Sequence, residues 1–146
     1  HRVLEIWDEW AAFGKDLEIT EFDLGCPDDK VHAEYTRDYL IAAFSHPAMK
    51  SFIFWGFWEG SHWRAKDGGA MVRRDWSKRP ALEAYEDLVF RQWWTRWEGR
   101  SAADGAARLR AFYGRHRVTA EAGDKRGEVT VQLLPGTSPV VEVRLP

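Results

Sequence analysis

The pattern of apolar and polar positions divides the chain into a first part that alternates helices with short strands and a second part that predicts strands alone. In the first part, apolar residues at helical spacing over 3–13 precede a short strand that begins at Leu17 and ends near Glu21. A helix over 30–44 and an almost entirely apolar segment over 51–58 follow. Such an apolar run is typical of a strand covered on both faces, so we expect a parallel sheet built from βα units.

Two shorter features complete this first part. Met71 and Val72 lie in a long polar loop and predict a small extra strand. Pro80 stands where the first turn of a helix favours proline, and Leu82 and Tyr85 begin the apolar face of that helix.

The second part has a different texture. From about Arg108 the chain consists of short alternating segments, RLRAFYG, HRVTAEA, EVTVQLL and VVEVRL, separated by Gly, Asp or Pro. This texture is typical of an antiparallel β-sandwich or a small barrel. We therefore expect two domains, an α/β domain over residues 1–92 and a β-sandwich module over residues 93–146.

Composition and charge argue against several classes of protein. The net charge of −2 predicts neither a nucleic-acid partner nor a basic membrane helix, and no apolar stretch is long enough for a transmembrane helix. Cys26 is the only cysteine, so we expect no intrachain disulfide and no cysteine metal site. His32 and His116 have no partners at metal-ligand spacing, so no metal or other cofactor is expected. The nine Trp are unusual, because Trp often marks aromatic ligand surfaces.

The candidate chemistry lies where the two predicted strands of the first part end. Glu21 and Asp23 follow the first strand, and Glu59, Trp63 and Arg64 follow the second. Loops at the carboxyl ends of parallel strands build the active sites of βα proteins. Carboxylates among Trp rings suit sugar chemistry, because sugar faces stack on aromatic rings and carboxyl groups assist glycosidic cleavage. The alternative is that these are ordinary solvated strand ends.

Three motifs in order make this hypothesis more specific. ITEFDL at 19–24 resembles the nucleophile motif of glycoside hydrolase family 10, the endo-β-1,4-xylanases. SHPAMKSFIFWGFWEGSHWR at 45–64 resembles the eighth-strand segment of that family, and RRDWSKRPALEAYEDLVF at 73–90 resembles its closing stretch. The resemblance covers about residues 1–92 and implies the last two βα units of a (β/α)8 TIM barrel.

The resemblance implies roles for six residues. It implies that Glu21 is the catalytic nucleophile and that Asp23 is a carboxylate that positions neighbouring groups, although Asp23 also suits a loop or helix cap. Glu59 stands at the position where the family usually has Asp, and the resemblance implies that it binds substrate. The resemblance implies that Trp55 and Trp63 form aromatic walls around the sugar. It implies that Arg64 supports the loop or binds a substrate hydroxyl. Trp55 also suits an ordinary core position.

The chain is too short for the whole barrel. A (β/α)8 barrel needs about 250 residues, and a retaining glycosidase needs two carboxyl groups about 5–5.5 Å apart. The resemblance places the acid/base Glu on the fourth strand of the barrel, which this sequence lacks. Because the chain also begins inside a predicted helix, we expect a C-terminal fragment that is inactive alone. Its exposed apolar faces predict self-association or pairing with the missing N-terminal part.

The second part resembles the β-sandwich modules of the carboxypeptidase-regulatory type. The turn SAADG at 101–105 and the segment that follows it carry this resemblance. A carbohydrate-binding module is one interpretation. A packing or spacer domain is favoured, because residues 101–146 offer only Phe112 and Tyr113 as large aromatics.

The sequence therefore predicts the C-terminal fragment of a secreted, retaining endo-β-1,4-xylanase-like hydrolase. The expected partner is a β-1,4-linked polysaccharide such as xylan, and the extracellular location follows from the family resemblance. Two alternatives remain open: a non-catalytic carbohydrate-binding protein, and a structural fragment that self-associates through Trp-rich faces.

Overall fold

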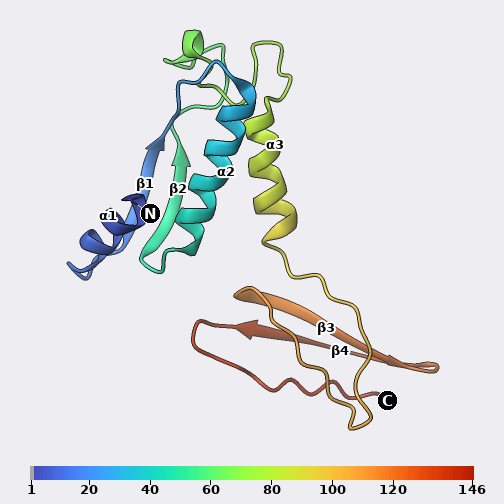
Figure 1. Ribbon diagram of the computed structural model, residues 1–146. Helices are drawn as coiled ribbons and strands as arrows, with labels where there is room; N and C mark the ends of the chain where they lie inside the picture. Colours follow the sequence, from blue (N-terminus) through green and yellow to red (C-terminus); the bar gives the residue numbers. More distant parts are fainter. Residues whose placement is uncertain (1) are drawn as a thin grey trace. The chain divides into compact units, whose positions relative to one another are not determined.

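The computed structural model describes residues 2–146 and divides the chain into two compact units, which separate between Gln92 and Trp93. The first unit contains every helix of the described residues and a parallel two-stranded sheet, and the second contains an antiparallel β-hairpin (Figure 1). No barrel is formed within residues 2–146. Among these residues, no helix is long and apolar enough to cross a membrane.

The first unit opens with a β–α–β crossover. Helix α1 (Arg2–Ala11) precedes strand β1 (Leu17–Phe22), helix α2 (Asp29–Ser45) and strand β2 (Met49–Phe54). Helix α2 begins where it does because the Asp28 side chain accepts hydrogen bonds from the backbone N–H groups of Lys30 at 2.9 Å and Val31 at 3.1 Å. An N-cap of this kind satisfies donors that the first turn leaves without a partner.

A long loop over residues 55–79 then leads to helix α3 (Pro80–Asp87). The loop contains a 3-10 turn over Ala65–Asp67, and α3 continues into a π-helical turn over Leu88–Gln92. The small strand expected at Met71–Val72 is reduced to isolated bridges, in which Val72 pairs with Trp58 and with Lys78. These bridges fold the loop back on itself instead of adding a strand to the sheet.

Both strands of the sheet end at the same edge. They are parallel, with Ile19 opposite Phe52 and Phe22 opposite Phe54, and the loop over residues 55–79 lies beyond their carboxyl ends (Figure 1). The register is irregular between Ile19 and Phe22, so one extra residue is accommodated on β1 within this interval, which contains Glu21. The pairing continues past β2, because the Trp55 N–H donates to the Phe22 carbonyl at 2.9 Å.

The core lies between this sheet and α2, and it is aromatic. The Phe22 ring lies 5.0 Å from those of Tyr39 and Phe52 and 5.6 Å from that of Phe54, measured between centroids. Trp7 of α1 meets Tyr39 edge-on at 5.5 Å. Paired aromatic rings of this geometry stabilise a core beyond the area that they bury.

The opposite face of the sheet is open. Ile53 and Trp55, which alternate with the helix-facing Phe52 and Phe54, are each 51% exposed. The prediction of a strand over 51–58 covered on both faces is therefore wrong in two respects, since β2 ends at Phe54 and only one face is covered. The strand ends early because Gly56 adopts a φ of 82°, which turns the chain away from the sheet.

The second unit is a hairpin of β3 (Gly114–Ala122) and β4 (Lys125–Leu133) in continuous antiparallel register. Gly123, with a φ of 62°, supplies the left-handed conformation that a tight hairpin turn needs. Two of the four predicted strands are thus confirmed. The expected β-sandwich is not formed in this unit, because the segments over 108–113 and 140–145 form no strands and no residue of the unit is buried.

Candidate functional site

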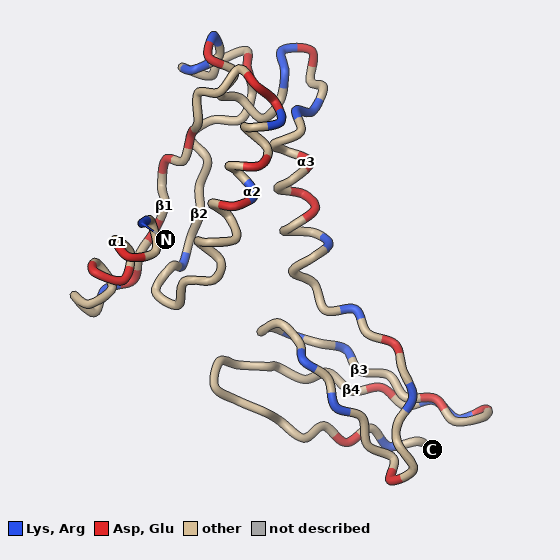
Figure 2. The backbone as a smooth tube through the Cα atoms, viewed as in Figure 1, with Lys and Arg blue, Asp and Glu red and all other residues tan. Residues whose placement is uncertain are grey.

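The carboxyl edge of the β1–β2 sheet brings together parts of the chain that carry most of the polar side chains singled out in the sequence. Glu21 and Asp23 stand at the end of β1, and the loop after β2 carries Glu59, Trp63 and Arg64. Figure 2 shows acidic and basic residues together in the loops beyond this edge. The edge is therefore the candidate site.

Glu21 is the penultimate residue of β1 and is exposed. Within residues 2–146 its carboxylate makes no hydrogen bond or ion pair. It borders an open depression of about 410 Å³ that is also lined by Asp23, Tyr35 and Tyr39. A carboxylate that is accessible and has no internal partner is available to a ligand.

Asp23 joins the two loops of the edge. Its Oδ2 accepts a hydrogen bond from the indole Nε1 of Trp63 at 2.5 Å, and its Oδ1 forms an ion pair with Nε of Arg64 at 3.4 Å. The Arg64 guanidinium in turn lies over the Trp63 ring, 4.2 Å from its centroid. Trp63 is thus held at its indole nitrogen and along one ring face, although the side chain is 63% exposed.

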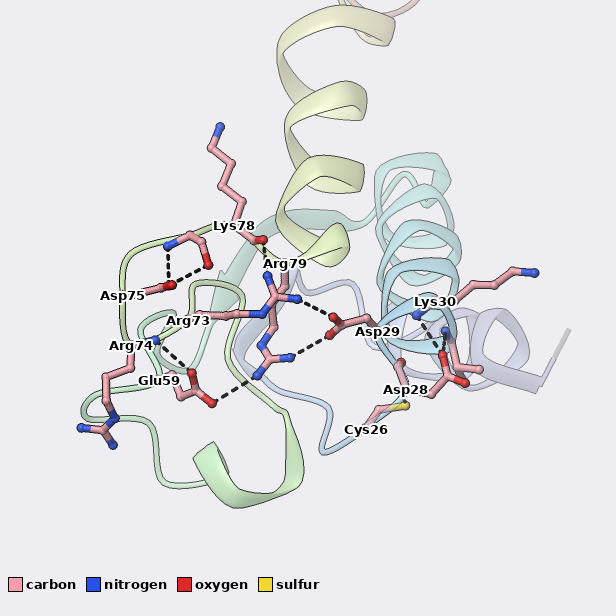
Figure 3. A network of polar contacts seen from close by, with 12 residues as sticks. Cys26, Asp28, Asp29, Lys30, Glu59, Arg73, Arg74, Asp75, Lys78 and Arg79 are labelled. Carbon is pink, nitrogen blue, oxygen red and sulfur yellow. Dashed lines mark hydrogen bonds and ion pairs between the residues drawn. The ribbon is translucent and has the colours of Figure 1, made fainter.

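Glu59 belongs to a different cluster, the ion-pair network of Figure 3. Its carboxylate accepts from Arg79 Nη2 at 3.2 Å and from the backbone N–H of Arg74 at 2.9 Å. Arg79 also donates to Asp29 at 2.7 Å, and Asp29 receives a second guanidinium from Arg73 at 2.5 Å. This network ties the start of α2, the loop after β2 and the start of α3 together.

The network also controls the charge of Asp29. Burial acts to raise the pKa of this carboxyl, but the hydrogen bond and charge of Arg79, with those of Arg73, outweigh burial and hold the pKa below its ordinary value. Sequence reasoning missed this cluster because Asp29 and Arg79 are far apart along the chain. The only local signal was the density of Arg and Lys around Pro80.

Buried polar side chains lie behind the edge. His32, Thr36 and His62 are buried, and His62 Nδ1 accepts the backbone N–H of Arg64 at 3.0 Å. His62, for which the sequence suggested no role, therefore orients the backbone next to the Trp63 loop. Burial, with the nearby charge of Arg79, lowers the pKa of His32 below its ordinary value and so favours the neutral ring.

The structure thus divides the predicted site residues into three sets. Asp23, Trp63 and Arg64 contact one another, and Glu21 stands free beside Asp23. Glu59 is engaged in the network with Arg79, away from any contact with Glu21 among the described residues. The sixth residue, Trp55, is exposed on the open face of the sheet. In the described part of the chain, no three acidic, His or Cys side chains are placed to hold a metal ion.

Comparison with known proteins gives distant similarities. The chain is 34% identical over 114 residues to the anti-sigma-I factor RsgI6 of Acetivibrio thermocellus, a match that covers 78% of this chain and 15% of that protein. It is 23% identical over 140 residues to endo-1,4-beta-xylanase 2 of Arabidopsis thaliana, covering 96% of this chain and 13% of the relative. Endo-1,4-beta-xylanase B of Cellvibrio japonicus is 26% identical over 73 residues, which are 50% of this chain and 12% of that protein.

These similarities define what the chain resembles. It is distantly similar to parts of endo-1,4-beta-xylanases and of an anti-sigma factor. The chain spans only 12–15% of the length of these relatives. No family model matches the chain.

Proposed function

We propose that this chain supplies the nucleophile and one sugar-contacting wall of a xylanase-like glycoside hydrolase domain. The observation that carries the proposal is the exposed Glu21 carboxylate beside Asp23, which holds the Trp63 ring in place. A carboxylate next to a positioned aromatic ring can bind a pyranose and face its anomeric carbon. Three of the motif residues thus lie at one edge of the sheet.

The proposed chemistry is retaining glycoside hydrolysis. A Glu21 oxygen forms a bond to the anomeric carbon while the bond from that carbon to the leaving sugar oxygen breaks. The leaving oxygen takes a proton from a second carboxyl group, which then deprotonates the water that releases the glycosyl ester. We propose that this second group comes from outside this chain, because the carboxylate of Glu59 is occupied by Arg79 and that of Asp23 by Trp63 and Arg64. The chain alone is therefore inactive on xylan.

The substrate proposed is a β-1,4-linked polysaccharide such as xylan, which places the protein outside the cell. The open face of the sheet, with Ile53 and Trp55 exposed, supports pairing with the rest of a larger domain, since an apolar face of this kind favours burial. Self-association through the same face is the corresponding expectation for the isolated chain.

A second candidate is carbohydrate binding without turnover. The similarity to a protein named an anti-sigma-I factor favours it, because that name denotes a regulatory role. The occupied Glu59 carboxylate is compatible with this candidate as well.

An activated glycoside separates the two candidates. A 2-fluoro-xylobioside with a dinitrophenolate leaving group needs no general acid, because dinitrophenolate leaves as a stable anion. We expect mass spectrometry to find the fluoroglycosyl ester on Glu21, no ester in Glu21→Gln, and an unchanged yield in Glu18→Gln, which removes another exposed carboxylate of β1. Binding of xylan without any ester on Glu21 would leave the non-catalytic candidate.

A further inference from the structure

Two Trp residues outside the Asp23 cluster form a stacked pair. The rings of Trp58 and Trp76 are nearly parallel, with an interplanar angle of 13° and centroids 5.1 Å apart. Trp58 is half-buried, whereas Trp76 is 63% exposed. One face of Trp76 rests on Trp58, the Phe57 ring lies 6.5 Å away at an interplanar angle of 51°, and the rest of the Trp76 ring is exposed.

The Trp58 ring of this pair is held in place by contacts with the backbone. A Cβ built on Gly60 would lie 2.0 Å from the Trp58 ring, so the Gly60 backbone packs directly against this indole. The indole Nε1 of Trp58 also donates to the Arg74 carbonyl at 3.4 Å. Trp58 is thus a fixed base on which Trp76 rests.

The outer ring is presented by a closed turn over residues 73–77. The Trp76 N–H donates to the Arg73 carbonyl at 2.9 Å, and the Arg73 N–H donates to the Ser77 carbonyl at 2.8 Å. Asp75 Oδ1 accepts from both the backbone N–H and the hydroxyl of Ser77. These hydrogen bonds fix the direction in which Trp76 projects.

Trp76 occupies a backbone conformation that suits glycine. Its φ is 68°, and it is the only non-glycine residue with a positive φ in the described part of the chain. For a bulky side chain this conformation costs about 1–3 kcal/mol. Such strain persists where the surroundings impose it and tends to gather at ligand sites.

We propose that the Trp76 ring, supported by Trp58, is a second binding platform that stacks on a pyranose ring of a β-1,4-linked polysaccharide. This inference rests on the proposed function for the choice of ligand. The platform shares no residue with the Glu21–Asp23–Trp63 edge. It would therefore hold the polysaccharide at a second point along its length.

The surroundings of the platform favour a sugar over a protein partner. Arg74 and Asp75 are exposed next to Trp76 in the turn, and Figure 3 shows the Arg74 guanidinium pointing away from the ion-pair network. A sugar offers an apolar ring face for Trp76 and hydroxyl groups for these charged side chains. A protein interface would have to desolvate both charges, and charged residues are depleted from interface cores.

The test measures binding of soluble xylan and xylohexaose to the full 146-residue chain by calorimetry and affinity electrophoresis. We expect Trp76→Gly to weaken binding about threefold to tenfold, as the loss of one aromatic stacking contact implies. The same variant relieves the positive φ, so its thermal midpoint should not fall below that of the parent chain. Trp76→Tyr, which restores a ring, should recover most of the affinity. Trp94→Ala is the matched control, because Trp94 is 62% exposed and lies in the second unit.

The pattern over three variants separates this inference from the proposed function. Weaker binding in both Trp63→Ala and Trp76→Gly supports both. If only Trp63→Ala weakens xylan binding, the platform is wrong and the proposed function stands. If only Trp76→Gly weakens xylan binding, the platform stands and the proposed function is wrong. If the parent chain and both variants all fail to bind xylan, the platform and the proposed function are both wrong. A change of Trp76→Gly from dimer to monomer with unchanged affinity would identify a contact between copies and overturn the platform.

Discussion

Arg79 joins helix α2 to the loop bearing the candidate site through two acidic partners. Its guanidinium donates to Asp29, the first residue of α2, and to Glu59 in the loop, and the side chain is only 13% exposed. We expect Arg79→Met to destabilise the first unit more than the substitution of any exposed charged side chain does. The methionine keeps most of the apolar stem but makes neither hydrogen bond.

The size of the effect can be worked from the contacts. Each charge-assisted hydrogen bond contributes about 1.5–3 kcal/mol. Asp29 keeps its bond from Arg73, Glu59 keeps the Arg74 N–H, and both acids are partly exposed, so the loss falls at the lower end. At about 1.5 kcal/mol for each of the two lost bonds, we expect a loss of about 3 kcal/mol in the free energy of unfolding. Arg79→Lys, which can reach one acid but not both, should lose about half as much.

The assay is urea unfolding followed by circular dichroism at a helical wavelength, because every helix of the described residues lies in the first unit. With a slope of about 1–1.5 kcal/mol/M, the midpoint of Arg79→Met should fall by about 2 M. Arg37→Met is the matched control, since among residues 2–146 Arg37 pairs with its exposed neighbour Asp38 alone, and its loss should change stability by less than about 0.5 kcal/mol. Equal midpoints for these two variants would refute the role given to the network.

Two further predictions concern His32 and Gly60. Because the pKa of His32 is lowered below its ordinary value of 6.5 in the folded chain, the unfolded chain binds more protons below that pH, and stability should fall as the pH drops through it. His32→Gln should flatten this dependence in urea titrations between pH 7 and pH 5, and an unchanged slope would assign it to other groups. Gly60→Ala should displace the Trp58 ring and destabilise the first unit by about 1–3 kcal/mol, with a changed near-ultraviolet circular dichroism spectrum. An unaltered spectrum and stability would contradict the close packing of Gly60 on Trp58.

The helices and first strand could be predicted from sequence because their signals are local. Asp28 caps α2 two residues from its first hydrogen-bonded partner, and Pro80 opens α3 as expected. The end of β2 could not be predicted in this way. The apolar run continues through Trp58, but Gly56 turns the chain at Phe54 and the later aromatic residues serve the loop.

Only part of the candidate site could be predicted from the sequence. The parallel β–α–β pattern places Glu21 and Trp63 at one edge of a sheet, and the structure agrees about that placement. The partners of Glu59 depend on contacts across 15 to 20 positions, and those of Asp29 across 44 to 50 positions, which no spacing rule reveals. The segments over 108–113 and 140–145 were predicted as strands and do not form them, because alternation alone does not provide a partner to pair with.

The crossover between β1 and β2 has a consequence for the order of folding. Parallel strands cannot be joined by a tight turn, so no hydrogen bond of this sheet can form until the whole of α2 spans the gap. The entropy of closing that loop falls if α2 is already helical, which places the helix in the transition state. We expect Asp28→Ala, which removes the cap, to slow refolding about as much as it lowers stability, with little change in the unfolding rate. A chevron plot in which only the unfolding arm moves would place helix formation after the barrier.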